Sequence, residues 1–270
     1  MGQAEAAYSS QLSTLGPIGR LLAYRDCLGI LVLRSLRVRY RRSVIGFGWS
    51  LLYPLLSMVV LTVVFARVFP TVEHYALYVV AGVMAWSFFS LSCLQSMDSL
   101  LGAAPVLRKV YVPSAVYPLA VVGANMANLL ASLLVFPLLV VFLDAPVRPD
   151  PGLLVLALLS LAGFAAGTGL LLAAFNLFFN DVRYFFENFL LLWFYASPIV
   201  YPAEVVPGHL SGLLWFNPFY WFLELFRAGL YGGAHLQPGT VLVTTAVSMA
   251  VLAVGWWAFS RLERRFHLYL

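Results

Sequence analysis

The chain has 270 residues, 62% of them hydrophobic and only 10% charged, with a net charge of +5 at neutral pH. A soluble domain has about 25% charged residues, and a soluble fold of this length has too much surface to hide so many apolar side chains. Composition therefore excludes an ordinary soluble protein and predicts an integral membrane protein. Nucleic-acid binding is disfavoured although the chain is basic. The basic residues flank apolar segments, where membrane topology and inner-leaflet lipid account for them.

Residues 1–47 precede the first apolar segment and are predicted to form a cytoplasmic N-terminal region. At 100° per residue, Arg34, Arg37 and Arg41 share one side of a helix. Arg39 falls among the apolar residues of the other side, so its side chain would have to extend towards the membrane surface. The pattern predicts a basic amphipathic helix lying in the cytoplasmic interface, with a simple topology anchor as the alternative. The apolar side is formed by Leu28, Val32, Leu33, Leu36 and Tyr40.

Residues 48–270 are predicted to form one transmembrane domain. A helix needs about 20 mostly apolar residues to cross the bilayer core, and six segments meet this requirement. The sequence therefore predicts an all-α integral membrane fold with six transmembrane helices. The predicted spans are 49–69, 76–101, 115–143, 153–179, 184–200 and 240–259.

The segment 201–239, between the last two predicted spans, is unusual. It contains several prolines, yet residues 213–230 are rich in Trp, Phe, Tyr and Leu. It is too interrupted for a span and too apolar for a solvated loop. Irregular backbone at membrane depth must be buried in protein or line a cavity. We expect one or two short re-entrant helices in the outer leaflet.

The distribution of positive charge predicts the orientation. With the N-terminus in the cytoplasm, thirteen of the sixteen Lys and Arg residues fall on the cytoplasmic side and three on the outer side. Cytoplasmic loops of membrane proteins carry such an excess of Lys and Arg. Both termini are therefore predicted to be cytoplasmic, as an even number of spans also requires.

The chain has no ATP-binding motif of its own. A P-loop needs a Lys followed by Ser or Thr, and the only lysine, Lys109, is followed by Val110. The four histidines do not fall at metal-ligand spacing and no nucleophile motif is present, so we expect no metal, cofactor or catalytic site in this chain. Asp98 and Glu187 lie near predicted span ends, where each is either a helix–helix contact or a candidate for ion coupling.

Two predicted cytoplasmic loops carry charged residues beside apolar ones. Arg108, Lys109 and Tyr111 lie between the second and third spans. Asp181 and Arg183 lie between the fourth and fifth spans. Charged rims around apolar anchors are typical of protein interfaces, so each loop is a candidate docking surface for a cytoplasmic partner. The alternative for each is a turn that faces lipid.

Two further patterns have alternative interpretations. Gly163 and Gly167 form a small-xxx-small motif, which serves either packing within one chain or dimerisation. Aromatic residues are dense at the end of the fifth span and in the segment after it, where they either anchor the chain at the membrane interface or line a path for sugar rings. The candidate path residues are Trp193, Tyr195, Tyr201, Trp215, Phe219 and Tyr220.

Three stretches of sequence resemble ABC-2-type permeases, and most of all the polysaccharide and polyol-phosphate exporters among them. Residues 39–54 read RYRRSVIGFGWSLLYP and resemble the start of the first span of these permeases. Residues 175–184 (FNLFFNDVRY) followed by 193–202 (WFYASPIVYP) resemble their junction between the fourth and fifth spans. Residues 217–220 (NPFY) with Arg227 resemble the segment before their last span. The resemblance covers roughly residues 20–265.

The resemblance implies a bacterial inner-membrane homodimer that works with two copies of a separate ATPase subunit, which binds ATP and Mg²⁺. It implies six spans, an N-terminal interface helix, re-entrant outer helices and a lipid-linked glycan as cargo: O-antigen, a capsule-like glycan or teichoic acid. The family often has Arg-Asp where this chain has Asn180-Asp181, so an ion pair made by that Arg is not expected here. The implied docking and gate residues are Arg37, Arg41, Arg108, Lys109, Tyr111, Asp181 and Arg183.

Two other functions are compatible with the sequence. An ABC-2 permease for a drug or other small molecule would share the same architecture, although the aromatic density favours a glycan. A membrane enzyme acting on a polyprenyl lipid would need clustered acids or histidines at one membrane face, and only Asp181 and Glu187 come close.

Overall fold

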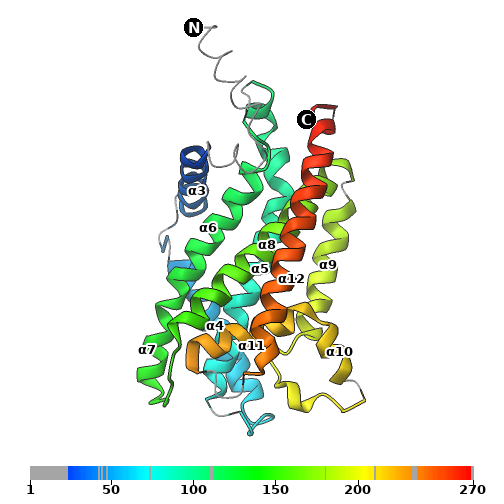
Figure 1. The fold of residues 1–270 in the computed structure, drawn as a ribbon. Helices are drawn as coiled ribbons and strands as arrows, with labels where there is room; N and C mark the ends of the chain where they lie inside the picture. The colour runs from blue at the N-terminus through cyan, green and yellow to red at the C-terminus, as the bar shows by residue number, and fades with distance from the viewer. Residues whose placement is uncertain are drawn as a thin grey trace.

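The computed structural model describes residues 24–41, 43, 45–46, 48–72, 74–109, 112–179, 181–209, 211–232 and 236–268. These residues form helices and no strands (Figure 1). The α-helices are α3 (Arg25–Tyr40), α4 (Gly48–Phe65), α5 (Tyr75–Leu107), α6 (Val116–Leu133), α7 (Val135–Phe142), α8 (Pro151–Phe178), α9 (Asp181–Ala196), α10 (Ser211–Phe216), α11 (Pro218–Tyr231) and α12 (Pro238–Leu262), and the 3₁₀ helices are η1 (Ala203–Val205) and η2 (Glu263–Leu268).

Within the described ranges, five helices are long and apolar enough to cross a membrane: α4, α5, the continuous pair α6–α7, α8, and α12 with its extension into η2. They coincide with five of the six predicted spans. The remaining one, predicted at 184–200, is occupied by α9. A helix of 16 residues rises about 24 Å, less than the roughly 30 Å of a bilayer core. By length, α9 therefore falls short of a full span.

Prolines explain where several helices begin and break. Pro151, Pro218 and Pro238 each stand at a helix start, where the missing N–H is not needed. Asp150 caps α8 by accepting a hydrogen bond from the Leu153 N–H at 3.0 Å. Pro137 cannot donate to the helical turn before it, and α6 gives way to α7 at that turn.

The long helices run side by side, and α5 lies at the centre of the bundle, in contact with α4, α6, α8, α9 and α11 (Figure 1). Its residues are the most buried of any candidate span, whereas those of α4 are the least buried. Aromatic rings fill the space between α5, α8, α9 and α11. The closest pairs are Phe164–Phe222, with ring centroids 4.6 Å apart, and Trp86–Phe219, at 4.9 Å.

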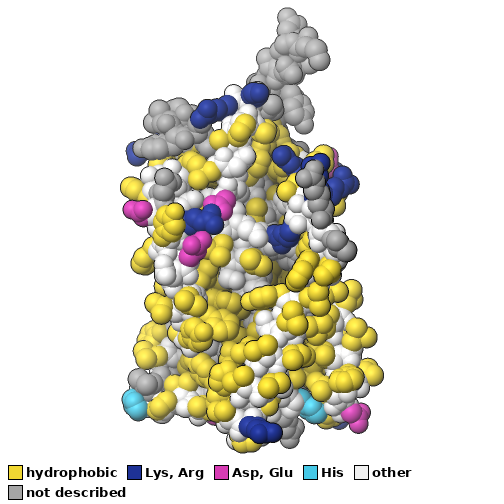
Figure 2. Space-filling view, turned by 180° about the vertical axis from the view of Figure 1, so that it is seen from behind, with side chains coloured by type: hydrophobic (Ala, Val, Ile, Leu, Met, Phe, Trp, Pro, Cys, Tyr) yellow, Lys and Arg dark blue, Asp and Glu magenta, His cyan; other side chains and the backbone are white. Residues whose placement is uncertain are grey.

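Charge and apolar surface are separated along the bundle. In Figure 2, most Lys and Arg side chains gather towards the end where α3 lies and where α12 finishes, and an apolar band covers the face beyond them. Helix α3 itself is seen nearly end-on beside α6 while the long helices run in the plane of Figure 1. It therefore lies across the bundle and not along it.

The small-residue motif of α8 packs inside the chain. A Cβ atom built on Gly167 would lie 2.5 Å from the main-chain oxygen of Val251 on α12, and one on Gly255 would lie 2.2 Å from the oxygen of Gly167. One turn away, the Ser248 hydroxyl donates to the carbonyl of Ser160 at 2.7 Å. Of the two interpretations of Gly163-xxx-Gly167, packing within one chain is therefore the one that the structure supports.

Gly167→Ala is expected to destabilise the protein by about 1–3 kcal/mol, because the added methyl meets backbone atoms of α12 that can yield only if the helix moves. Gly102→Ala is the matched control. It lies in α5 with open space around it, so the better helix former should leave stability unchanged or slightly raised. Thermal unfolding of both variants in detergent checks this, and equal melting temperatures would contradict the close approach.

Candidate functional site

Helix α3 packs one face against α6. Its half-buried positions recur in pairs every four residues, at 27–28, 31–32, 35–36 and 39–40. Val32 lies so close to Gly123 that a Cβ there would be 2.9 Å from its Cγ2 atom. Leu33, predicted on the apolar side, is 53% exposed, because the stripe packed against α6 is narrower than the apolar arc.

The opposite face of α3 combines positive charge with exposed apolar side chains. Arg37 and Arg41, both predicted docking residues, lie on this face with Arg34. Together with Ile30, Leu33 and Val38 they line a shallow groove. We call this set the basic face of α3.

Arg39 does not extend towards the membrane surface as predicted. Its guanidinium donates a hydrogen bond to the side-chain oxygen of Gln95 on α5, so a polar partner inside the bundle replaces the expected solvent. Gln95 accepts a second hydrogen bond from Asn125 on α6, at 3.2 Å. Beside them, the Tyr40 hydroxyl donates to Asn128 at 2.8 Å. The end of α3 is thus fixed to α5 and α6 by polar side chains.

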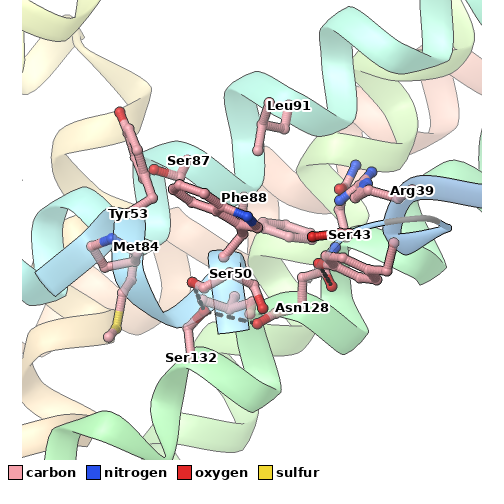
Figure 3. A pocket seen from close by; sticks show the side chains of 15 residues that line it. Arg39, Ser43, Ser50, Tyr53, Met84, Ser87, Phe88, Leu91, Asn128 and Ser132 are labelled. Atoms are coloured by element: carbon pink, nitrogen blue, oxygen red, sulfur yellow. Dashed lines mark hydrogen bonds between the residues drawn. The ribbon is translucent and has the colours of Figure 1, made fainter. Parts of the chain in front are cut away.

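These residues border a cavity of about 310 Å³ between the end of α3, the start of α4, and helices α5 and α6 (Figure 3). We call it the α3–α6 cavity. The sequence analysis missed it, although Asn125, Asn128 and Ser132 follow one another on one face of a predicted span and are all buried. That spacing was the available signal. The lining residues are Arg39, Tyr40, Ser43, Trp49, Ser50, Tyr53, Pro54, Met84, Ser87, Phe88, Leu91, Asn125, Asn128, Leu129 and Ser132.

The predicted docking residues of the two loops lie in the same part of the molecule. Arg108 and Lys109 are exposed just beyond the end of α5, and Asp181 is exposed at the start of α9. Tyr111 lies outside the described residues. Arg183 makes ion pairs with Asp98 on α5 and, at 3.0 Å, with Glu187 one turn further along α9. Asp98 and Glu187 are therefore helix–helix and intrahelical contacts, the first of the two roles considered for them.

At the other end of the bundle, side chains of α5 and α11 hold the non-helical segment that follows α9. The Tyr78 hydroxyl donates to the carbonyls of Pro198 and Tyr201, at 3.0 and 2.8 Å. Tyr75 donates to Val200 at 2.6 Å, and Arg227 donates to Ile199 at 3.2 Å. Four successive carbonyls, 198–201, thus each lie within hydrogen-bond distance of a side-chain donor, and Pro198 and Tyr201 share the single proton of the Tyr78 hydroxyl. We call this arrangement the outer clamp.

Arg227 is the charged member of the outer clamp. It is only 3% exposed, and its guanidinium carbon lies 3.5 Å from the centre of the Tyr78 ring. Its Nε and Nη1 atoms have no hydrogen-bond partner among the described residues, and Glu224 lies 3.9 Å away. Burial raises the pKa of the Glu224 carboxyl, and the positive charge of Arg227 opposes that shift. Such an incompletely paired buried cation is costly to keep.

The candidate path residues divide into two groups. Trp193 and Tyr201 line a second, mostly apolar cavity of about 570 Å³ between α9 and α10, and Tyr195 and Trp215 are exposed nearby. Phe219, in contrast, is fully buried among the rings of the core. Tyr220 is half-buried and packs edge-on against Trp221. The structure therefore brings Trp193 and Tyr201 together and places Phe219 behind them.

The family model for ABC-2 type transporters matches residues 27–231, which extend from α3 to the end of α11. The chain belongs to the ABC-2 type transporter family. The matched region contains both the α3–α6 cavity and the outer clamp, so the two polar arrangements of this ABC-2 protein lie inside the shared part of the fold. The family resemblance drawn from the sequence is confirmed, and the chain is a multi-pass membrane protein.

Curated relatives align over most of the ABC-2 chain. The O-antigen export system permease protein RfbA of Myxococcus xanthus is 31% identical over 255 residues, which cover 92% of this chain and 95% of the relative. RfbA of Klebsiella pneumoniae is 28% identical over 251 residues, with 89% and 93% covered. The capsule polysaccharide export inner-membrane protein CtrC of Neisseria meningitidis is 28% identical over 233 residues, with 78% and 82% covered.

Proposed function

We propose that this chain is the permease subunit of an ABC exporter that moves a lipid-linked polysaccharide across the bacterial inner membrane, driven by a separate ATPase subunit. The observation that carries the proposal is the alignment with O-antigen export permeases over about nine tenths of both chains. The match to a capsule export protein supports the same class of cargo. A small-molecule ABC-2 permease remains the alternative, and no feature of the site favours it.

The proposed topology has six spans: the five long helices and α9, which is the fifth span in chain order. Helix α9 runs alongside the long helices in Figure 1, and the bilayer can thin around a short span. The end that carries α3, the end of α5 and the end of α12 holds most of the Lys and Arg side chains and is assigned to the cytoplasm (Figure 2). Helices α10 and α11 then lie at the outer end as re-entrant helices, and α3 is the interface helix.

The cytoplasmic end offers the surfaces for the ATPase. Arg37 and Arg41 on the basic face of α3, with Arg108 and Lys109 after α5, present exposed positive charge. The Tyr111 loop, Asp181 and Arg183 complete the proposed docking and gate set. Two ATPase subunits bind ATP and Mg²⁺ and act on two copies of this chain.

The proposed path for the cargo lies between two copies of the permease. Helices α4 and α9 expose more apolar surface than the centre of the bundle, which suits either lipid or a second copy. Trp193 and Tyr195 lie on α9 and Tyr201 and Trp215 lie near it, where flat rings can stack on sugars. Tyr220 lies on α11, and Phe219 supports the set from the core. Closure of the ATPase dimer moves the docked helices, opens this path and drives the glycan outwards.

Co-purification tests the proposal. The permease, expressed together with its proposed ABC ATPase subunit, is expected to co-purify with it, and the complex should hydrolyse ATP while the permease alone does not. Replacing Arg108 and Lys109 with glutamate should remove the ATPase from the complex, because it reverses the exposed charge that is proposed to contact it. The same change at Arg148, exposed near the opposite end of the bundle, is the control. A permease that exports its glycan in cells lacking the ATPase would contradict the proposal.

A further inference from the structure

The lining of the α3–α6 cavity places several polar side chains among apolar ones. It combines one guanidinium, two amides and four serines with aromatic rings, and it lies where α3 meets α4, beside the central helix α5. Polar groups at membrane depth are expensive unless they are paired, and they commonly mark a path or a binding site. Its volume of about 310 Å³ lies at the lower end of the range for small-ligand sites, which suits one sugar ring with its substituent.

Two buried atoms beside this cavity have no partner within the described part of the chain. Asn125 is 2% exposed and its Oδ1 accepts no hydrogen bond, while Asn128 is 9% exposed and its Nδ2 donates none. Their other amide atoms are used, by Gln95 and by Tyr40. The unpaired acceptor and donor are therefore complementary to a ligand that both donates and accepts hydrogen bonds, and a hydroxyl group does both.

Charge adds a second requirement. Among the described residues that line the cavity, Arg39 alone is charged, and its visible side-chain partner is the neutral amide of Gln95. No carboxylate stands in the lining to balance it. A guanidinium in a low-dielectric site favours an anion, and its fork of N–H groups fits phosphate oxygens. Trp49, Tyr53 and Phe88 supply flat faces against which a sugar ring could lie.

We propose that the α3–α6 cavity binds a phosphate ester that carries hydroxyl groups: Arg39 holds the phosphate, and Asn125 and Asn128 hold the hydroxyls. Two sources have this chemistry, namely the sugar-phosphate end of the lipid-linked cargo and the head group of phosphatidylglycerol. The cargo as source rests on the proposed function, whereas the binding chemistry does not. Because Arg39 and Tyr40 are the last residues of α3, a ligand bound in the cavity would also fix the position of α3, whose basic face points away from the bundle.

Two substitutions keep the local hydrogen bonds and change only what the ligand meets. Arg39→Gln retains a donor for Gln95 but removes the charge. Asn128→Asp retains the oxygen that accepts from Tyr40 but replaces the unpaired donor with a negative oxygen. The matched control is Arg25→Gln, which makes the same change at an exposed position of the same helix outside the basic face. Arg39→Lys restores the charge and should recover much of the binding.

The experiment measures equilibrium binding of radiolabelled polyprenyl diphosphate–N-acetylglucosamine to the permease–ATPase complex in phosphatidylcholine nanodiscs without ATP. We expect Arg39→Gln and Asn128→Asp each to weaken binding at least about tenfold, and Arg25→Gln to leave it unchanged. Competition by phosphatidylglycerol at equal concentration would support the site and make membrane lipid its source. Failure of phosphatidylglycerol to compete would support the site and make the cargo its source.

Unchanged affinity in both variants would overturn the inference. So would equal competition by dodecyl maltoside, which carries hydroxyls but no phosphate. Because the assay needs neither ATP hydrolysis nor export, either result would leave the proposed export function standing. Failure of the wild-type permease to hold the ATPase, in contrast, would contradict the proposed function. Binding of phosphatidylglycerol to the α3–α6 cavity could still be tested on the permease alone.

Discussion

Arg227→Met is expected to reduce glycan export at least about tenfold while leaving the melting temperature within a few degrees of the wild type. The substitution removes the hydrogen bond to the Ile199 carbonyl and the contact with the Tyr78 ring. The outer clamp then holds the 198–201 segment through Tyr75 and Tyr78 alone. This segment joins α9 to α10 and α11, so its position sets where Trp193 and Tyr201 stand relative to each other.

The stability is expected to change little because two large effects oppose each other. Leaving the Ile199 carbonyl unpaired costs about 1–3 kcal/mol. Removing a buried guanidinium whose Nε and Nη1 lack partners releases a desolvation penalty of several kcal/mol. Arg227 occupies a position where an apolar side chain of similar size would be tolerated, which makes it a candidate for function. Buried charges in membrane helices occur mainly at functional sites.

Export and stability must be measured on the same variants to separate these effects. Surface glycan in cells reports export, and thermal unfolding of the purified protein reports stability. Arg148→Met is the control, since that residue is exposed in the chain segment that pairs with the end of α11. Tyr78→Phe should reproduce part of the export defect, because it removes the hydroxyl that serves Pro198 and Tyr201. Wild-type export by Arg227→Met would contradict a functional role for the outer clamp.

The sequence predicted the positions of the helices better than the contacts between them. Runs of apolar residues located five spans within a few residues, because crossing a bilayer demands length and apolarity whatever the fold. Helix α9 was harder, since the predicted span continued through apolar residues to Val200 whereas the chain leaves the helix at Ala196. The residues that follow are held by Tyr75, Tyr78 and Arg227, more than 20 residues away in either direction, and no local pattern contains that information.

The candidate sites show the same limit. The periodicity around Arg39 placed it among the apolar residues of its helix but could not supply Gln95, its partner 56 residues later. Without that partner, extension to solvent was the only way to satisfy the charge. Gly163-xxx-Gly167 likewise indicated a close helix contact without identifying α12 as the neighbour. Pairings between distant helices depend on packing of the whole bundle, which one sequence does not display.

Asn217→Ala is expected to destabilise α10 and α11 by about 2–4 kcal/mol and to abolish most export. The side-chain oxygen of Asn217 accepts from the Trp193 indole at 2.8 Å and from the Phe219 N–H at 3.0 Å, which caps α11. Its amide nitrogen donates to the Ser197 hydroxyl and the Ala196 carbonyl, at 2.9 and 3.2 Å. Losing the cap costs about 1 kcal/mol, and leaving the Trp193 indole unpaired costs a further 1–3 kcal/mol.

Asn217→Asp separates the two halves of this contact. Aspartate keeps the oxygen that caps α11 and accepts from Trp193, but it loses both donations to the end of α9 and brings in a charge. We therefore expect α11 to remain folded while the junction with α9 loosens, so that protease cleavage between 197 and 216 increases while the melting temperature falls less than in Asn217→Ala. Asn188→Ala is the matched control, because that exposed asparagine makes one hydrogen bond within α9. If Asn188→Ala and Asn217→Ala lowered stability equally, Asn217 would not be the residue that joins α9 to α11.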